Sequence, residues 1–291
     1  MKSFSGGSFP MTTITAQISD LFQHLTPVQQ QVAHFIHENA GQIAFLNASQ
    51  LAESIGVSNA AVSRFVRRLG YPDFASFREA LAAEVIADFS TAKRLEDSAR
   101  QAKERGVLDS ILPQDVANIQ DLRANLNRQA FEQAVFSLCR ARRIYILGLR
   151  STYALAYYLA FYLRFFLDNV GLIELGKGNY TDEVVGANSE DVLVSISFKR
   201  YTRQTVELQQ SIRGMGPTVI GISDSDLSPI AASADISLTA QPLLPSYFES
   251  FTAPMSLINA ILAAVAVQMQ SEALPVLNRL ETILDALNIY Y

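Results

Sequence analysis

Cysteine is nearly absent from this sequence of 291 residues, which contains only Cys139. A single cysteine excludes an internal disulfide framework and a metal site built from several cysteines. Long apolar runs are absent as well, since the two most apolar stretches, Tyr153–Phe166 and Ala253–Val267, are interrupted by Arg164 and by Ser256. Neither provides the roughly 18 uninterrupted apolar residues of a membrane span, and the first residues, MKSFSGGSFPM, lack the apolar centre of a secretory signal. We therefore expect a cytoplasmic protein that has no membrane partner.

An excess of basic residues, which is typical of nucleic-acid-binding proteins, is also missing, because the formal net charge at pH 7 is −5. The charge is unevenly distributed, however. Between Ser58 and Arg78 there are four arginines and one aspartate, a net charge of +3, so the rest of the chain carries −8. A short basic segment on an acidic protein indicates one small surface that binds an anion. A solvated arginine-rich helix face gives the same pattern, so charge alone leaves both interpretations open.

The sequence does have enough apolar material for packed cores, since hydrophobic residues make up 49% and charged residues 18% of the chain. This composition excludes disordered and collagen-like proteins. The length predicts about two domains. We expect a mobile Gly/Ser-rich N-terminus over residues 1–12, a helical domain over 13–90, a polar helical linker over 91–125 and a second domain over 126–291.

The helical domain contains two short helices joined by a turn. Asn47 or Ser49 can cap the first helix, which ends at Gly56, and Ser58 can cap the second, Asn59–Leu69. The second helix has apolar residues at positions 62, 65, 66 and 69, the spacing of a buried stripe. Its opposite face carries the asparagine and arginine side chains that read base edges in the major groove. The residues that we predict to contact DNA are Ser58, Asn59, Ala60, Ser63, Arg64, Arg67 and Arg68.

Helix-turn-helix units also serve as plain packing elements, but here the pattern continues beyond the two helices. The segment resembles the N-terminal signature SxLAxxxGVSxxxVxRFxRxLGYxxFxxFR of the RpiR/MurR family of bacterial transcription regulators. The matching residues are Ser49, Leu51, Ala52, Gly56, Val57, Ser58, Val62, Arg64, Phe65, Arg67, Leu69, Gly70, Tyr71, Phe74, Phe77 and Arg78. The resemblance implies a DNA-binding transcription regulator. Because one recognition helix reads only a half-site, we expect a homodimer or homotetramer on a palindromic double-stranded operator.

After residue 143, short β-type runs alternate with helical segments, which predicts a parallel sheet with helices on both faces. The expected strands are Ile144–Leu149, Leu172–Leu175, Val192–Ser197, Thr218–Ser223 and Ile236–Thr239, and a long apolar helix begins near Thr252. The predicted fold class is therefore α/β. An all-α helix-turn-helix domain precedes a doubly wound, flavodoxin-like parallel sheet.

Ligands of such sheets bind beyond the carboxyl ends of the strands. Ser151 follows the first strand and Thr202 follows the third, and each opens a helix. Helix N-termini with hydroxyl side chains favour anions, although each residue could also be a simple N-cap. The segment 246–252 precedes the long helix and should approach the same edge, where Glu249 could accept hydrogen bonds from a hydroxyl or amine of a ligand or could be a helix-start carboxylate. The residues that we predict to bind a small anionic effector are Ser151, Ser197, Lys199, Arg200, Thr202 and Glu249.

This half of the chain resembles the sugar isomerase (SIS) domain, which in the RpiR/MurR family follows the DNA-binding unit and usually senses a phosphosugar. Ser151 matches the first-loop serine of that domain, and Ser197 and Thr202 match the ends of its SxSGxT loop. Lys199 and Arg200 replace the usual Ser-Gly, so the glycine that lets the backbone wrap around a phosphate is missing. The two cations indicate a phosphosugar or a carboxylate held by charge, with Arg200 able to bind it in a bidentate manner. Solvated surface cations are the alternative.

SIS folds also belong to sugar-phosphate isomerases and lyases, so an enzyme with an accessory helical domain is the alternative function. Isomerisation needs a base and a ring-opening group, which is often histidine. No histidine follows His37, and Glu249 is the only plausible base near the predicted ligand. The sequence has no P-loop, no GxGxxG and no metal-ligand cluster. We expect a non-enzymatic regulator without cofactor or metal, in which an anionic metabolite modulates operator binding.

Overall fold

The computed structural model describes residues 14–43, 46–88, 91–177 and 180–290. The chain divides into two compact units, Met1–Ser90 and Thr91–Tyr291. The predicted mobile segment 1–12 lies outside the described residues.

The described part of the N-terminal unit is helical. Thr26 caps the second helix by exchanging hydrogen bonds with Gln29, and Pro27 occupies the first helical position, where its missing N–H costs no intrahelical bond. The helices pack around a small core that includes Val32 and Phe65. The helices are α1 (Ile14–Leu21), α2 (Pro27–Ile43), α3 (Ala48–Ile55), α4 (Asn59–Arg68) and α5 (Phe74–Asp88), with a 3-10 turn η1 (Phe22–His24).

The described part of the C-terminal unit contains a five-stranded parallel sheet in the order β2-β1-β3-β4-β5. This is the flavodoxin-like order of a doubly wound sheet, so the predicted fold class is confirmed. Four strands begin at the predicted residue, whereas β2 lies two residues earlier because Val170 pairs with Ile144 and residue 175 begins a 3-10 turn. The strands are β1 (Ile144–Gly148), β2 (Val170–Leu172), β3 (Val192–Ile196), β4 (Thr218–Ser223) and β5 (Ile236–Thr239).

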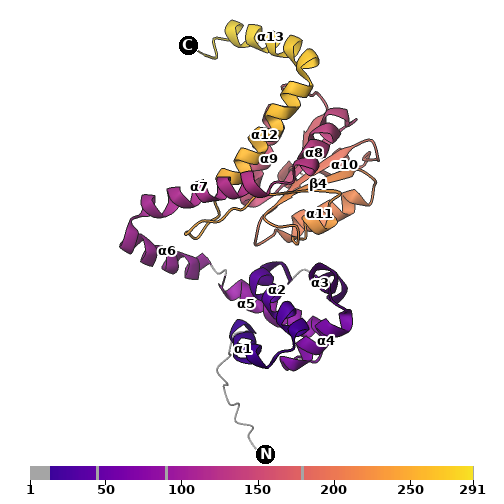
Figure 1. Ribbon diagram of the computed structural model, residues 1–291. Coiled ribbons are helices and arrows are strands. Elements are labelled where there is room, and N and C mark those ends of the chain that lie inside the picture. Colours follow the sequence, from indigo (N-terminus) through magenta and orange to yellow (C-terminus); the bar gives the residue numbers. More distant parts are fainter. Residues whose placement is uncertain (1–13, 44–45, 89–90, 178–179, 291) are drawn as a thin grey trace, which may run out of the picture. The chain divides into compact units, whose positions relative to one another are not determined.

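Helices cover both faces of the sheet (Figure 1). Alternate strand residues belong to two separate cores. Ile144 and Ile146 pack on the side of α8 (Arg128–Arg140), α9 (Tyr153–Leu163) and α12 (Thr252–Gln268). Tyr145 and Leu147 pack on the side of α10 (Tyr180–Val184) and α11 (Arg203–Arg213). Every residue of β1 and β3 is buried, which explains why these strands are almost continuously apolar rather than alternating.

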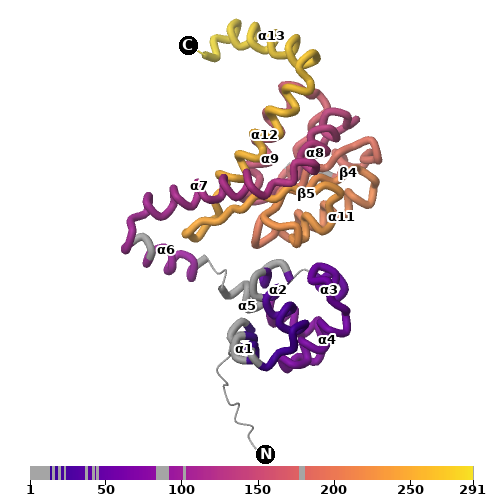
Figure 2. Tube along the Cα trace, in the orientation of Figure 1, coloured from indigo at the N-terminus to yellow at the C-terminus, as the bar shows by residue number. Residues whose placement is uncertain are grey.

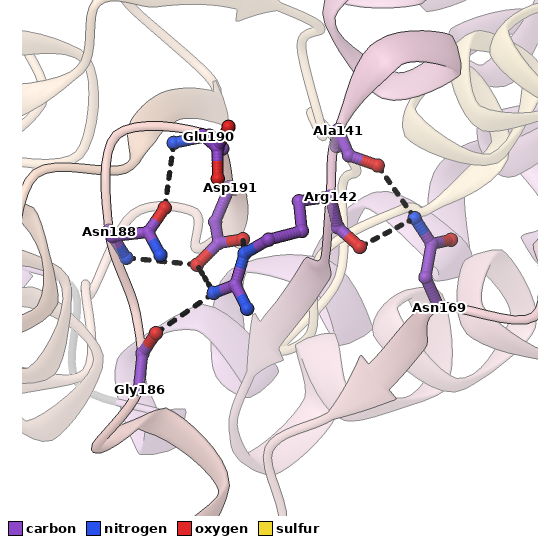
Figure 3. Close-up of polar contacts among 7 residues, drawn as sticks. All are labelled: Ala141, Arg142, Asn169, Gly186, Asn188, Glu190 and Asp191. Carbon is purple, nitrogen blue, oxygen red and sulfur yellow. Dashed lines mark hydrogen bonds and ion pairs between the residues drawn. The ribbon is translucent and has the colours of Figure 1, made fainter.

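The amino ends of the strands are held together by polar contacts (Figure 3). The Arg142 guanidinium donates to both carboxylate oxygens of Asp191, at 2.9 and 2.7 Å, and to the carbonyl of Gly186 at 2.9 Å. The hydrogen bond with Asp191 raises the pKa of Arg142. The Asn169 amide donates to the carbonyls of Ala141 and Arg142 at 2.7 and 3.1 Å. These contacts tie the segments that enter β1, β2 and β3, so this edge is structural and the opposite, carboxyl edge is the place to look for a ligand.

The predicted linker 91–125 is helical, but it belongs to the C-terminal unit. It forms α6 (Thr91–Arg105) and α7 (Val107–Asn125), and α7 crosses α12 (Figure 2). Leu122 joins the core on the α12 side of the sheet, and the buried Asn118 amide donates to the carbonyl of Leu243 at 2.6 Å. The polar composition of this segment therefore did not indicate that it packs against the sheet domain. Its second half, α7, contributes to a core and is not a free linker.

The last helix, α13 (Gln270–Ala286), follows α12 after a bend of 101° and extends away from the sheet (Figure 1). Of its residues only Ala273 is buried. No single helix in the described ranges combines the length and the apolar composition of a membrane span, and only the bent pair α12 and α13 meets both criteria together.

Candidate functional site

The turn between α3 and α4 is built by local signals that the sequence contains. Asn47 caps α3 in a reciprocal pair with Gln50, each side chain accepting from the other residue's backbone N–H at 2.9 Å. α3 ends at Gly56, whose φ of 76° lies in the left-handed region that residues with a Cβ adopt at a cost of about 1 kcal/mol. Ser58 caps α4 by accepting from the N–H of Ala61 at 3.2 Å. The turn is therefore specified within a dozen residues.

α4 has one buried face and one exposed face, as predicted. Val62, Phe65 and Val66 are fully buried against α3, whose Leu51 and Ala52 are also buried. The predicted DNA-contacting residues are on the opposite face. Ser58, Asn59, Ala60, Arg64, Arg67 and Arg68 are exposed and Ser63 is half-buried.

Two of these exposed residues also make contacts within the unit. The Asn59 amide donates to the hydroxyl of Ser49 at 2.9 Å, and the Arg68 guanidinium donates to the carbonyl of His24 at 2.9 Å. Arg64 and Arg67 differ, because no hydrogen bond or ion pair joins them to any residue that the structure describes. Of the basic residues predicted to contact DNA, these two are the most available to an external anion.

A pocket of about 440 Å³ lies at the carboxyl edge of the sheet. It is lined by residues 149–152 after β1, residues 197–203 after β3 and the segment before α12 that includes residues 247–249 and 251. The structure thus brings together all six candidates that the sequence indicated for effector binding. These are Ser151, Ser197, Lys199, Arg200, Thr202 and Glu249.

At the end of β1, the backbone of residue 148 lies so close to Thr152 and Ala156 that only glycine fits there. A Cβ on Gly148 would lie 2.8 Å from the carbonyl oxygen of Thr152 and 2.9 Å from the Cβ of Ala156, which real Cβ atoms do not tolerate. The Thr152 hydroxyl donates back to the carbonyl of Leu149 at 2.8 Å and closes the turn. The chain can therefore reverse directly from β1 into α9, and this tight reversal places Ser151 at the pocket.

Two pocket arginines have backbone conformations that are unusual for residues with a side chain. Arg150 has a φ of 57° and Arg200 a φ of 30°. Arg200 occupies the position of the glycine in the loop that the sequence resembles, and it has a positive φ although it carries a side chain. Strain of this kind costs about 1–3 kcal/mol per residue and concentrates at functional sites.

A buried polar cluster lies beside the loop that follows β3. The Tyr201 hydroxyl donates to the carboxylate of Asp224 at 3.1 Å, and Asp224 is only 4% exposed. Burial raises the pKa of Asp224, against the opposing effect of the Tyr201 hydrogen bond, and burial raises the pKa of Tyr201 as well. Burial lowers the pKa of Lys199, while the charge of Asp224 opposes that shift. Lys199 is half-buried, whereas Arg200 is exposed.

Glu249 has a partner that the sequence did not reveal. Its carboxylate accepts from the guanidinium of Arg94, on α6, at 2.8 Å, and Arg94 also donates to the carbonyl of Ser246 at 3.2 Å. Glu249 is therefore held in an ion pair, which does not suit a catalytic base that must take up a proton.

Sequence reasoning missed several pocket residues. Arg150 is next to Ser151 at the same strand end, so the rule that identified Ser151 could have found it. Arg203, Tyr247 and Phe248 also line the pocket, but no motif distinguishes them. No group of three or more His, Cys, Asp or Glu that could hold a metal ion occurs in the part of the chain that the structure describes.

Comparisons with known proteins match both units. Residues 12–88 match the family model of the helix-turn-helix domain, rpiR family, and residues 137–264 match that of the SIS domain. A relative from Pseudomonas aeruginosa, the HTH-type transcriptional regulator HexR, is 25% identical over 231 residues, 78% of this chain and 79% of that protein.

Solved structures agree with these matches. The sugar isomerase domain of an RpiR transcription factor from Sphaerobacter thermophilus has a TM-score of 0.56 at 25% identity, over 59% of this chain and 96% of that one. The NanR protein of Vibrio vulnificus, complexed with ManNAc-6P, has a TM-score of 0.58 at 17% identity, over 94% of this chain and 98% of that one.

Proposed function

We propose that this chain, which belongs to the rpiR family of helix-turn-helix transcription regulators and carries a C-terminal SIS domain, binds an operator through α4 under the control of a small anionic metabolite. The observation that carries the proposal is that one chain combines two separate groups of cationic side chains. α4 exposes Arg64 and Arg67 on a helix whose other face is buried, and the pocket at the carboxyl edge of the sheet is lined by three arginines and a lysine.

The DNA-binding half of the proposal assigns separate roles along α4. The first turn, behind Ser58, presents backbone N–H groups that favour a phosphate. Ala60 is small and exposed, which lets the helix approach the base edges closely. Arg64 and Arg67 reach guanine edges, where a guanidinium can donate two hydrogen bonds. Asn59 is oriented by its hydrogen bond to Ser49, and Arg68 chiefly braces α4 against the carbonyl of His24.

The ligand half of the proposal rests on the charge of the pocket. Arg150, Lys199, Arg200 and Arg203 line it, and its acidic residue Glu249 is already paired with Arg94. A pocket of this kind selects a phosphate or a carboxylate over a neutral compound. The NanR structure that shares the fold is complexed with ManNAc-6P, which supports a phosphosugar as one candidate class, and the Lys199-Arg200 pair supports a carboxylate as the other.

We further propose that the pocket binds its ligand without chemical conversion. Sugar isomerisation needs a free base and a ring-opening group. Glu249 is engaged by Arg94, and the sequence has no histidine after His37 to open a ring. A sugar-phosphate turnover that Glu249→Gln abolishes would contradict this part of the proposal.

A thermal-shift screen of sugar phosphates and small carboxylates tests the whole proposal. A ligand that binds only the folded protein stabilises it by about 2.7 kcal/mol at a concentration 100 times its Kd, so at least one anion should raise the melting temperature. The same anion should change the affinity for DNA that the protein selects from a random pool. An anion that stabilises the protein but leaves DNA affinity unchanged would contradict the regulatory link.

We propose that the regulator acts as a homodimer or homotetramer in which α9 contributes to the contact between copies. Tyr157, Phe161 and Tyr162 on α9 are 51%, 43% and 37% exposed, and their rings contact one another. Contiguous exposed aromatic surface is typical of protein interfaces, and reading two half-sites requires a second copy. α12, the other strongly apolar helix of this unit, is mostly used within the chain, since Leu257, Ile258 and others of its residues lie in the core.

Replacing Phe161 by glutamate should shift the protein towards monomers, because a carboxylate buried between two apolar surfaces loses its hydration without gaining a partner. Sedimentation velocity at micromolar concentration measures this, with circular dichroism to confirm the fold. The matched control is Gln210→Glu on the exposed face of α11, which should leave the assembly unchanged. Identical sedimentation of the wild type and Phe161→Glu would exclude α9 from the interface.

A further inference from the structure

The pocket rim is held from outside by the two helices that open the C-terminal unit. We define the rim segment as residues 240–251, between β5 and α12; residues 247–249 and 251 of it line the pocket. From α6, Arg94 donates to the Ser246 carbonyl and to the Glu249 carboxylate. From α7, Asn118 donates to the Leu243 carbonyl, and the Asp115 carboxylate accepts from the hydroxyl of Ser250. The rim segment therefore has the pocket on one side and α6 and α7 on the other.

Glu249 adds a negative charge to a pocket whose other charged residues are cations. It is the one carboxylate among the described lining residues, and a bare negative charge there would repel an anionic ligand. Arg94 is not itself a lining residue, yet its guanidinium is 2.8 Å from the Glu249 carboxylate. The two side chains are only 18% and 24% exposed, so solvent ions screen their attraction weakly.

We propose that Arg94 is a positioning residue that makes the pocket able to accept an anion by neutralising Glu249, and that a bound anion in turn holds α6 on the rim segment. The second statement follows from the first, because coupling between two binding events is reciprocal. Docking of Arg94 raises the affinity for the anion, so the anion stabilises the docked state of α6 by the same factor. This inference rests on the proposed function, in which the pocket binds an anion.

This coupling suggests how ligand binding in the pocket could affect DNA binding by the N-terminal unit. α6 is the first helix after the N-terminal unit, since Thr91 follows Ser90 directly. A ligand that changes how firmly α6 is held therefore acts on the segment that joins the two units along the chain. A ligand shifts the population of two conformations only if it binds one of them more tightly. The Arg94–Glu249 pair provides such a difference, because an anion should bind more tightly when Arg94 is docked on Glu249.

A double-mutant cycle with inorganic phosphate as the probe tests the inference. Titration calorimetry compares the wild type with Arg94→Ala, Glu249→Gln and the double variant. Arg94→Ala should weaken phosphate binding by about tenfold, since an uncompensated carboxylate then faces the ligand. Glu249→Gln should bind phosphate at least as tightly as the wild type. The double variant should bind phosphate as Glu249→Gln does, because the negative charge that Arg94 would neutralise is already absent.

Two further measurements separate this role from a merely structural one. Arg100→Ala is the matched control, because Arg100 lies on the same helix and pairs locally with Asp97 at 2.7 Å; this variant should bind phosphate like the wild type. Hydrogen exchange of residues 91–105 should slow when phosphate binds the wild type and should not respond in Glu249→Gln. If the role of Arg94 were purely structural, phosphate affinity would instead fall equally in Arg94→Ala and in the double variant.

The outcomes distinguish this inference from the proposed function. Phosphate binding by the wild type with unchanged affinity in Arg94→Ala, or with no rescue in the double variant, overturns the inference alone. Failure of the wild type to bind phosphate or any anion of the screen overturns the ligand half of the proposed function and the inference with it.

Discussion

Alanine at both Arg64 and Arg67 is expected to remove sequence-specific DNA binding. Each guanidinium that donates two hydrogen bonds to a guanine is worth about 1–3 kcal/mol, so the pair together should cost on the order of 10²- to 10⁴-fold in affinity. The fold should survive, because both side chains are exposed and the buried stripe of α4 does not include them. Neither arginine has a partner among the described residues whose loss would destabilise the N-terminal unit.

Fluorescence anisotropy at one fixed salt concentration measures this effect, with DNA that the wild-type protein selects from a random pool. Arg123→Ala is the control for the loss of an exposed arginine, because Arg123 is an exposed residue of α7 in the other unit. Arg68→Ala should chiefly lower the melting temperature, since it removes the hydrogen bond to the His24 carbonyl. Wild-type affinity in the double variant would place the operator on another surface.

Replacing Arg200 should give the second large effect, a loss of about tenfold or more in affinity for the anionic effector, since an arginine held to an anion by two hydrogen bonds is a strong contact. DNA affinity in the absence of effector should stay at the wild-type level, because Arg200 belongs to the pocket of the C-terminal unit.

Comparing alanine with glycine at this position separates charge from backbone strain. Arg200 has a φ of 30°, which alanine adopts at a cost and glycine does not, so Arg200→Gly should be more stable than Arg200→Ala by about 1 kcal/mol. Both variants lose the guanidinium and should lose effector affinity equally. Arg213→Ala is the matched control, because Arg213 pairs with Asp235 at 2.9 Å at the far end of α11. Full effector affinity in Arg200→Gly would show that the loop backbone, and not the charge, holds the ligand.

The α3–α4 unit could be predicted from the sequence because each of its determinants is local. Asn47 and Ser58 cap helices, Gly56 ends one, and the apolar residues of α4 recur at helical spacing. All of these act within one or two helical turns, so they are visible in a short stretch of sequence. The strands were predictable for a related reason. A strand buried on both faces is apolar along its whole length, and β1 and β3 are of this kind.

Polar side chains that depend on distant partners could not be assigned in this way. Glu249 has the same appearance in the sequence whether it is a free base, a helix-start carboxylate or half of an ion pair. Its partner Arg94 lies 155 positions away, and no periodicity links the two. Asp224 and Tyr201 show the same limitation, because their pairing depends on how β4 ends beside the loop that follows β3.

The sequence by itself determined the α3–α4 unit, where four of the five strands begin, which face of α4 is polar and which strand ends supply the pocket, because these properties follow from caps, spacing and the rule that parallel strands end at one edge. Only the tertiary structure decided that α7 joins a core and that Arg94 pairs with Glu249. These features arise from contacts between residues far apart in the chain, and such contacts leave no local pattern.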